Sequence, residues 1–225
     1  LAFAGGAMVY VSLTEIFNKS SEAFQQVYDK DKAFAAATLA FLAGMGAIAL
    51  IDRLVPNPHE TLDPHDPAFQ ENKRRHIARV GMMAAFAITA HNFPEGLATF
   101  FATLENPAVG MPLALAIAIH NIPEGISIAA PVYFATRNRK KTVLACLASG
   151  LAEPLGAVLG YTMLKPFLSP FVFGAVFGVI AGVMVFLALD ELLPAAKRYS
   201  DGHETVYGLT SGMAVIALSL VLFHF

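Results

Sequence analysis

The segment His91-Asn92-Phe93-Pro94-Glu95-Gly96 is repeated, with one residue changed, as His120-Asn121-Ile122-Pro123-Glu124-Gly125. Each copy lies inside a long apolar run. A histidine and a glutamate four positions apart share one face of a helix. Charged groups at membrane depth are costly and are mostly functional. The repeat therefore predicts two membrane-spanning helices, each of which presents a pair of metal ligands.

The composition is that of a membrane protein. Of the 225 residues, 56% are hydrophobic and 14% are charged, whereas soluble domains carry roughly 25% charged residues. The net charge of -2 says little about partners, but the lack of a basic stripe argues against a nucleic-acid partner and leaves membrane lipid. The one cysteine, Cys146, is interpreted as a small buried hydrophobe. Leu1 already lies in an apolar run with no signal peptide before it, so we expect that a preceding helix is missing.

Apolar runs long enough to cross a bilayer fill most of the chain. A spanning helix needs about 20 predominantly apolar residues. The sequence predicts an all-α polytopic membrane bundle, a single domain over 1–225, with a polar cytoplasmic loop at 57–76. The predicted spans are 1–18, 33–55, 77–104, 109–135, 142–168, 171–196 and 206–225.

Lysine and arginine set the predicted orientation, because cytoplasmic linkers carry an excess of them. Three linkers that must share one side are rich in these residues, and we place them in the cytoplasm, with the C-terminus outside. The basic residues concerned are Lys73, Arg74, Arg75, Arg137, Arg139, Lys140, Lys141, Lys197 and Arg198.

Counting residues along the spans brings the polar groups to one depth. His91 and His120 lie nearly equally far from the turn near Asn106, about 22 Å below it at ~1.5 Å per residue. Glu124 and Glu153 lie nearly equally far from the next turn, at Asn138. Three consecutive spans therefore carry one predicted layer of metal ligands, formed by His91, Asn92, Glu95, His120, Asn121, Glu124 and Glu153.

The donor atoms of this layer suit divalent transition metals. Imidazole binds zinc, copper, iron and nickel, whereas carboxylate and amide oxygens suit harder ions. A set without cysteine should bind less tightly than a closed thiolate site, and moderate affinity lets an ion leave again. The layer is therefore predicted to be a transport site.

The prolines and glycines of the two motifs carry further expectations. Pro94 and Pro123 each remove a backbone donor, which predicts broken helices that line a polar cavity. Gly96 and Gly125 are expected to let neighbouring helices approach closely. The small-residue faces at Gly44-Met45-Gly46 and 156–160 are compatible with a homodimer.

Two further features leave alternatives open. The segments 11–15 and 187–191 form a distant repeat at opposite faces, which indicates an inverted repeat. In it Glu15 is an entry residue and Asp190 with Glu191 an exit pair, or all three are capped interfacial carboxylates. The loop histidines capture or sense metal, or they belong to a plain solvated loop; they are His59, His65 and His76.

At this point the sequence resembles the ZIP (Zrt/Irt-like) metal transporter family, particularly its bacterial ZupT-type members. The resemblance covers nearly the whole chain and rests on HNFPEG (91–96), HNIPEG (120–125), SGLAEPLG (149–156), VSLTE (11–15) and ALDELLP (188–194). It implies a multi-pass protein of the inner, or plasma, membrane with eight transmembrane helices, of which seven are visible here, and with both termini outside. It also implies import of divalent cations, chiefly zinc but also iron, manganese, cobalt and cadmium, with the metal as substrate and no cofactor.

The resemblance further implies a two-metal site. One position would use His91, Glu95, His120 and Glu124. The other would use Asn92, Asn121 and Glu153 and share the two motif glutamates. Some family members have Gln-Asp where this chain has His120-Asn121, so the second position here has one carboxylate fewer.

Two other classes of protein were weighed against a transporter. A membrane di-metal enzyme would carry a Glu-x-x-His repeat or a His-Glu-x-x-His motif, and neither is present. A metal sensor finds support only in the histidine-bearing loop. The sequence contains no ATP-binding motif, which argues against a primary pump. Uniport, cotransport and channel mechanisms stay open.

Overall fold

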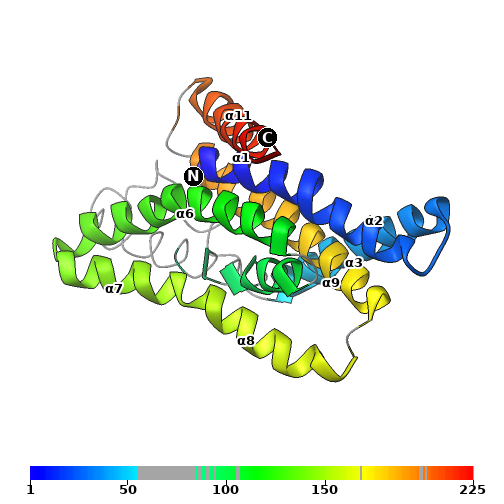
Figure 1. Ribbon diagram of the computed structural model, residues 1–225. Helices are drawn as coiled ribbons and strands as arrows, with labels where there is room; N and C mark the ends of the chain where they lie inside the picture. The colour runs from blue at the N-terminus through cyan, green and yellow to red at the C-terminus, as the bar shows by residue number, and fades with distance from the viewer. Residues whose placement is uncertain are drawn as a thin grey trace.

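The computed structural model describes residues 1–54, 85, 88–89, 92–93, 95–104, 107–167, 169–197, 200 and 202–224, and this part of the chain is helical. The predicted all-α class is confirmed there. The first helix is continuous and consists of α1 (Ala2–Val11), the π-helical η1 (Ser12–Ile16) and α2 (Phe17–Gln25). Figure 1 shows it in blue, running from the centre of the bundle to one end.

The remaining elements follow the predicted spans to within a few residues. Residues 85, 88–89, 92–93 and 95–104 are helical and belong to the third predicted span, and we call this described part of the span helix C. The other elements are α3 (Lys30–Leu54), α6 (Pro107–Thr136), α7 (Arg139–Gly150), α8 (Ala152–Leu164), the 3-10 turn η2 (Lys165–Phe167), α9 (Pro170–Leu187), the π-helical η3 (Ala188–Leu192), α10 (Leu193–Lys197) and α11 (Glu204–His224). The predicted loop at 57–76 lies outside the described residues.

The predicted end of the first helix, near Asn18, is wrong, because the helix continues to Gln25. Two of the polar residues after Asn18, Ser20 and Ser21, are buried. Ser20 is fully buried and its hydroxyl donates a 2.6 Å hydrogen bond to the carbonyl oxygen of Gly174 in α9. Polar side chains with a partner on a neighbouring helix are compatible with a helix inside a membrane bundle.

The helix break predicted at Pro123 is also wrong, whereas Pro94 lies outside the described residues. The 30-residue α6 runs through Pro123 without interruption. The break lies instead at Leu151, between α7 and α8. Pro154 has no N–H to donate to the carbonyl oxygen of Gly150, so one helical hydrogen bond is missing directly beside Glu153.

Reciprocal glycine contacts hold two pairs of helices together. A Cβ atom built on Gly6 of α1 would lie 1.9 Å from the carbonyl oxygen of Leu209, and one on Gly212 of α11 would lie 2.0 Å from that of Phe3. Figure 1 shows these two helices side by side. Helices in a membrane gain no hydrophobic drive by associating, so close backbone packing at small residues is a main source of stability.

The second pair, α3 and α9, repeats this arrangement. A Cβ atom on Gly44 would lie 2.2 Å from the carbonyl oxygen of Val179, and one on Gly182 would lie 2.0 Å from that of Phe41. In both pairs each glycine follows, by three positions, the residue whose carbonyl the other glycine meets. The two interfaces therefore have the same local design.

The two π-helical segments support the predicted inverted repeat. η1 and η3 each span five residues and contain the related sequences SLTEI and ALDEL. Their helices are antiparallel, because Ser20 bonds to Gly174 whereas Gly5 faces Leu192. Glu15 lies inside η1 and so near the middle of its helix, not toward the outer end as predicted. The entry and exit roles of Glu15, Asp190 and Glu191 stay predictions.

The glycine faces proposed for a homodimer are mostly used inside the chain. Gly44 packs on α9, Gly156 on the carbonyl oxygen of Phe93, and Gly160 on the side chain of Leu97. Only Gly46, with no atom within 4 Å of its built Cβ, is open. Most of these glycines therefore pack within the chain, and the homodimer stays a prediction.

Gly44 and Gly46 form a matched pair for testing this packing. Gly44→Ala would push two backbones apart, and overpacking of this kind costs about 1–3 kcal/mol, which lowers the melting temperature by several degrees. Gly46→Ala meets open space and gains helix propensity. We expect thermal unfolding in detergent to show a lower melting temperature for Gly44→Ala only. Equal melting temperatures would contradict this account of the α3–α9 interface.

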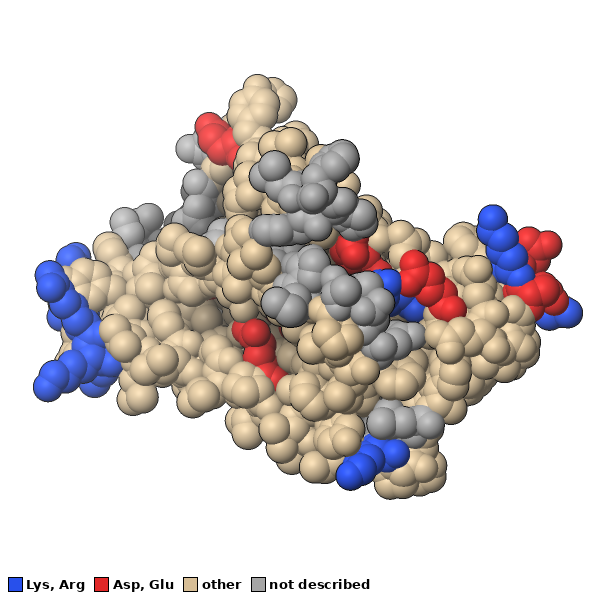
Figure 2. Space-filling view, in the orientation of Figure 1, with Lys and Arg blue, Asp and Glu red and all other residues tan. Residues whose placement is uncertain are grey.

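The surface fits a membrane. Four described segments are long and apolar enough to span a bilayer: Lys30–Leu50, Arg139–Met163, Pro170–Asp190 and Glu204–Val221. Large apolar side chains such as Leu39, Leu144 and Met163 are about two-thirds exposed or more. Figure 2 shows Lys and Arg gathered at the ends of the molecule, with one cluster where α6 meets α7.

Candidate metal site

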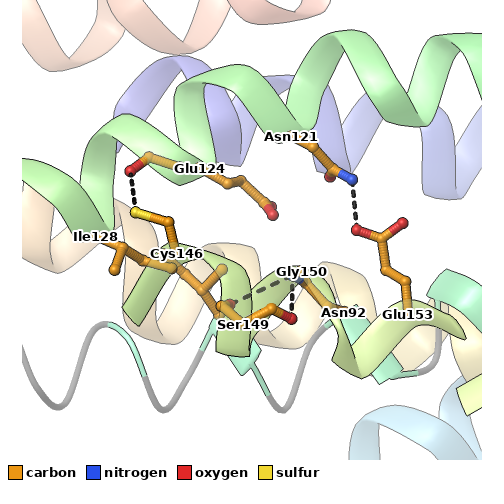
Figure 3. A pocket seen from close by; sticks show the side chains of 10 residues that line it. Asn92, Asn121, Glu124, Ile128, Cys146, Ser149, Gly150 and Glu153 are labelled. Atoms are coloured by element: carbon orange, nitrogen blue, oxygen red, sulfur yellow. Dashed lines mark hydrogen bonds between the residues drawn. The ribbon is translucent and has the colours of Figure 1, made fainter. Parts of the chain in front are cut away.

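Helix C, α6 and the α7–α8 pair line a half-open cavity of about 100 Å³. Its position is the one that the depth count predicts, because each of three consecutive spans contributes polar residues to it. Figure 3 shows the side chains from these helices facing one another across the space. The lining residues are Ile88, Asn92, Asn121, Glu124, Gly125, Ile128, Cys146, Ser149, Gly150 and Glu153.

Asn121 and Glu153 face each other across the cavity (Figure 3). The amide nitrogen Nδ2 of Asn121 donates a 2.5 Å hydrogen bond to Oε1 of Glu153. Because an ionised carboxylate can only accept, this contact fixes the orientation of the amide. Oδ1 of Asn121 is buried and has no hydrogen-bond partner among the described residues. The amide oxygen of Asn121 is therefore a buried acceptor in a fixed orientation.

Asn92 repeats this arrangement on helix C. Its Nδ2 donates to the carbonyl oxygen of Ser149 at 3.1 Å and contacts the Ser149 hydroxyl at 3.4 Å. A backbone carbonyl can only accept, so the Asn92 amide is also fixed. Its Oδ1 has no hydrogen-bond partner in the described part of the chain, and the residue is only 4% exposed. Orphaned buried acceptors are rare, and one explanation is a bound ion.

The motif glutamates are buried. Glu95 is 0% exposed and Glu124 is 2% exposed. Glu124 lines the cavity, whereas Glu95 is next to Gly96, which packs on the backbone of Glu153. Burying carboxylates is costly, so buried charges are paired or coordinate a metal. The buried charge therefore fits a cation site.

A third reciprocal glycine contact fixes helix C against α8 at the site itself. A Cβ atom on Gly96 would lie 1.9 Å from the carbonyl oxygen of Glu153, and one on Gly156 would lie 2.1 Å from that of Phe93. The expectation of a close approach is thus confirmed for Gly96. It is wrong for Gly125, whose built Cβ meets no atom within 4 Å, because the Cα of that glycine borders the cavity and not the backbone of a neighbouring helix.

The predicted histidines cannot be placed with the same detail. His91 lies outside the described residues, and His120 belongs to α6 but its side chain is not described. Within the described ranges no three His, Cys, Asp or Glu side chains cluster closely enough to hold a metal. The role of all seven predicted residues as metal ligands therefore stays a prediction.

Among the lining residues that the sequence did not indicate, three belong to α7. Ser149, Gly150 and Cys146 lie on the face of helix α7 that leads to Glu153. The signal was their spacing from Glu153, since residues three, four and seven positions apart share a helix face. Cys146 is partly exposed, so its interpretation as a simple buried hydrophobe is wrong.

Comparison with known proteins agrees with this geometry. A family model described as "ZIP Zinc transporter" matches residues 55–220. A protein from Neisseria meningitidis serogroup B named "Zinc transporter ZupT" is 90% identical over the whole chain, which covers 84% of that relative. Relatives of the same name from Xanthomonas axonopodis and Lysinibacillus sphaericus are 71% and 46% identical over 100% and 99% of this chain, which covers 83% and 84% of them.

The helical bundle with its buried polar cavity, together with these matches, defines a multi-pass membrane transporter and not an enzyme. The chain belongs to the ZIP zinc transporter family. The resemblance seen in the sequence motifs is thus confirmed at the level of the family.

Proposed function

We propose that this protein carries zinc across the membrane into the cytoplasm through the cavity between helix C, α6 and α7–α8. One observation carries the proposal: two fixed and buried amide oxygens, on Asn92 and Asn121, lie in the wall of one cavity with the carboxylates of Glu124 and Glu153. Oxygen donors with buried negative charge replace the water shell of a divalent cation. Zinc is also what the names of the similar proteins state.

The proposed site holds two metal positions. His91, Glu95, His120 and Glu124 form the first, and Asn92, Asn121 and Glu153 form the second, with the two motif glutamates shared. The hydrogen bond from Asn121 to Glu153 supports a second position that is weaker than the first, because it occupies one carboxylate oxygen with an amide donor. A weak second position favours passage of an ion over its storage.

The same donors are compatible with iron, manganese, cobalt and cadmium, because mixed nitrogen and oxygen ligands discriminate poorly among divalent first-row metals. Import is the direction that the family resemblance implies, and the basic linkers indicate which side of the protein is cytoplasmic. Arg137, Arg139, Lys140 and Lys141 lie together at the α6–α7 turn, and such turns face the cytoplasm.

The direct test is metal flux in vesicles that contain the purified protein and a trapped zinc-sensitive dye. We expect zinc added outside to raise the dye signal well above that of protein-free vesicles, without ATP. Competition by Fe²⁺, Mn²⁺, Co²⁺ and Cd²⁺ then measures the metal range. Vesicles that bind zinc but show no flux above the protein-free background would refute transport.

Asn121→Asp tests the second metal position. The variant loses the amide donor and places two carboxylates at hydrogen-bond distance, which is unfavourable when the site is empty. A metal ion would relieve this repulsion. We expect a lower melting temperature without zinc and a larger zinc-induced rise than in the wild-type protein, measured by thermal unfolding in detergent. An unchanged zinc-induced rise would contradict a metal position between Asn121 and Glu153.

A further inference from the structure

Cys146 stands in the wall of the cavity although no proposed metal position uses it. It lies on α7, about two helical turns before Glu153, and therefore nearer the basic turn at 137–141. Its sulfur lies 3.5 Å from the carbonyl oxygen of Gly125 on α6 (Figure 3). The thiol thus faces the opposite wall of the cavity and not the lipid.

The 3.5 Å separation suits two ligands of one cation. Zinc binds sulfur at about 2.3 Å and oxygen at about 2.0–2.2 Å in tetrahedral geometry, which places the two donors ~3.6 Å apart. A thiol is also a weak hydrogen-bond donor, so the contact with Gly125 holds the sulfur only loosely. The sulfur and this carbonyl oxygen can therefore bind a common ion with little movement.

Independent observations point to a ligand in the same cavity. Asn92, only 4% exposed, has its Oδ1 without a hydrogen-bond partner among the described residues, and it lines the wall together with Cys146. The built Cβ atoms of Gly125 and Gly150 meet no atom within 4 Å. The cavity thus has room beside the sulfur, and its wall holds a buried oxygen donor that the second proposed metal position also uses.

We propose that the sulfur of Cys146 and the carbonyl oxygen of Gly125 form a soft-donor position for a thiophilic divalent cation, of the Cd²⁺ type, beside the transport site on the side of the 137–141 turn. The inference rests on the proposed function, since the ion reaches this position through the same cavity. When the ion binds, a metal–sulfur bond forms, the S–H bond breaks and the proton passes to water. No oxidant or reductant takes part.

The single thiol makes the test direct. In vesicles that contain the whole chain, the rate of alkylation of Cys146 by a maleimide is measured by mass spectrometry with and without Cd²⁺ or Zn²⁺. We expect Cd²⁺ to slow alkylation at least 10-fold, and at lower concentration than Zn²⁺, because a bound thiolate cannot attack the reagent. We also expect Cys146→Ser to raise the concentration of Cd²⁺ needed for half-maximal uptake, relative to that of Zn²⁺, about 10-fold.

A matched control moves the thiol to the lipid face. Leu147 is 58% exposed, so Cys146→Ser combined with Leu147→Cys keeps one thiol per chain but turns it away from the cavity. We expect its alkylation to be insensitive to both metals. Equal protection of the two thiols, or no protection of Cys146, would overturn the inference.

The two proposals fail in different ways. If only the Cys146 position is wrong, Cys146→Ser leaves the ratio of Cd²⁺ to Zn²⁺ uptake at the wild-type value, whereas removal of the Glu124 carboxylate still stops zinc uptake. If transport itself is wrong, vesicles with wild-type protein show no zinc flux, whatever the alkylation rates. Protection of Cys146 by Cd²⁺ in that case would still support the ligand position.

Discussion

Glu124→Gln is expected to abolish zinc uptake. The substitution keeps the size of the side chain but removes a negative charge that is 98% buried in the cavity wall and that both proposed metal positions share. A loss of about 3 kcal/mol in metal binding corresponds to about 100-fold, so uptake at low micromolar zinc should fall by at least that factor. The measurement is initial zinc flux in dye-loaded vesicles.

A surface glutamate provides the control for the loss of one charge. The Glu22 side chain is 60% exposed and pairs with Lys19 one turn away, and exposed pairs of this kind contribute little to stability. We expect Glu22→Gln to transport like the wild-type protein. If Glu124→Gln were equally active, the buried carboxylate would not belong to the ion path.

Gly96→Ala is expected to have the second largest effect. A methyl group at this position would lie 1.9 Å from the carbonyl oxygen of Glu153, so helix C and α8 must separate. Their separation moves Asn92, which lines the cavity, and the neighbouring Glu95 away from α8. A metal site tolerates errors of only about 0.5 Å in its ligands, and we expect zinc flux to fall at least 10-fold in protein that still inserts into the membrane.

Two comparisons separate this effect from general misfolding. Gly156→Ala attacks the same interface from the other helix, through the carbonyl oxygen of Phe93, and should act in the same way. Gly46→Ala, which meets open space, should retain full flux. Wild-type flux in Gly96→Ala, at equal membrane abundance, would show that the close approach of these helices is dispensable.

The positions of the helices were predictable because apolar length and polar turns dictate spans in a membrane. The convergence of Asn92, Asn121, Glu124 and Glu153 was predictable for a related reason. A helix rises by a fixed amount per residue, so residues equally far from a shared turn lie at equal depth. The described side chains of the site agree with this count.

The helix break was not predictable from proline alone. Pro123 lies within the unbroken α6, whereas Pro154 coincides with the break at Leu151. Both prolines remove one hydrogen bond, so the difference depends on the surroundings of each helix and not on the residue type. The same holds for the glycines. Gly96 and Gly125 occupy equal places in the two motifs, but only Gly96 has the backbone of another helix at the position where a Cβ atom would stand.

In the matched α1–α11 and α3–α9 interfaces, each close-packing glycine of one interface has a counterpart in the other, so the same substitution can be made at corresponding positions. Gly44 corresponds to Gly212, and Gly182 to Gly6, with the nearest carbonyl oxygen in each case between 1.9 and 2.2 Å from the built Cβ. Any functional asymmetry between the two halves, such as a preference for opening to one side, can then be measured as the difference within each corresponding pair, with the packing chemistry held constant.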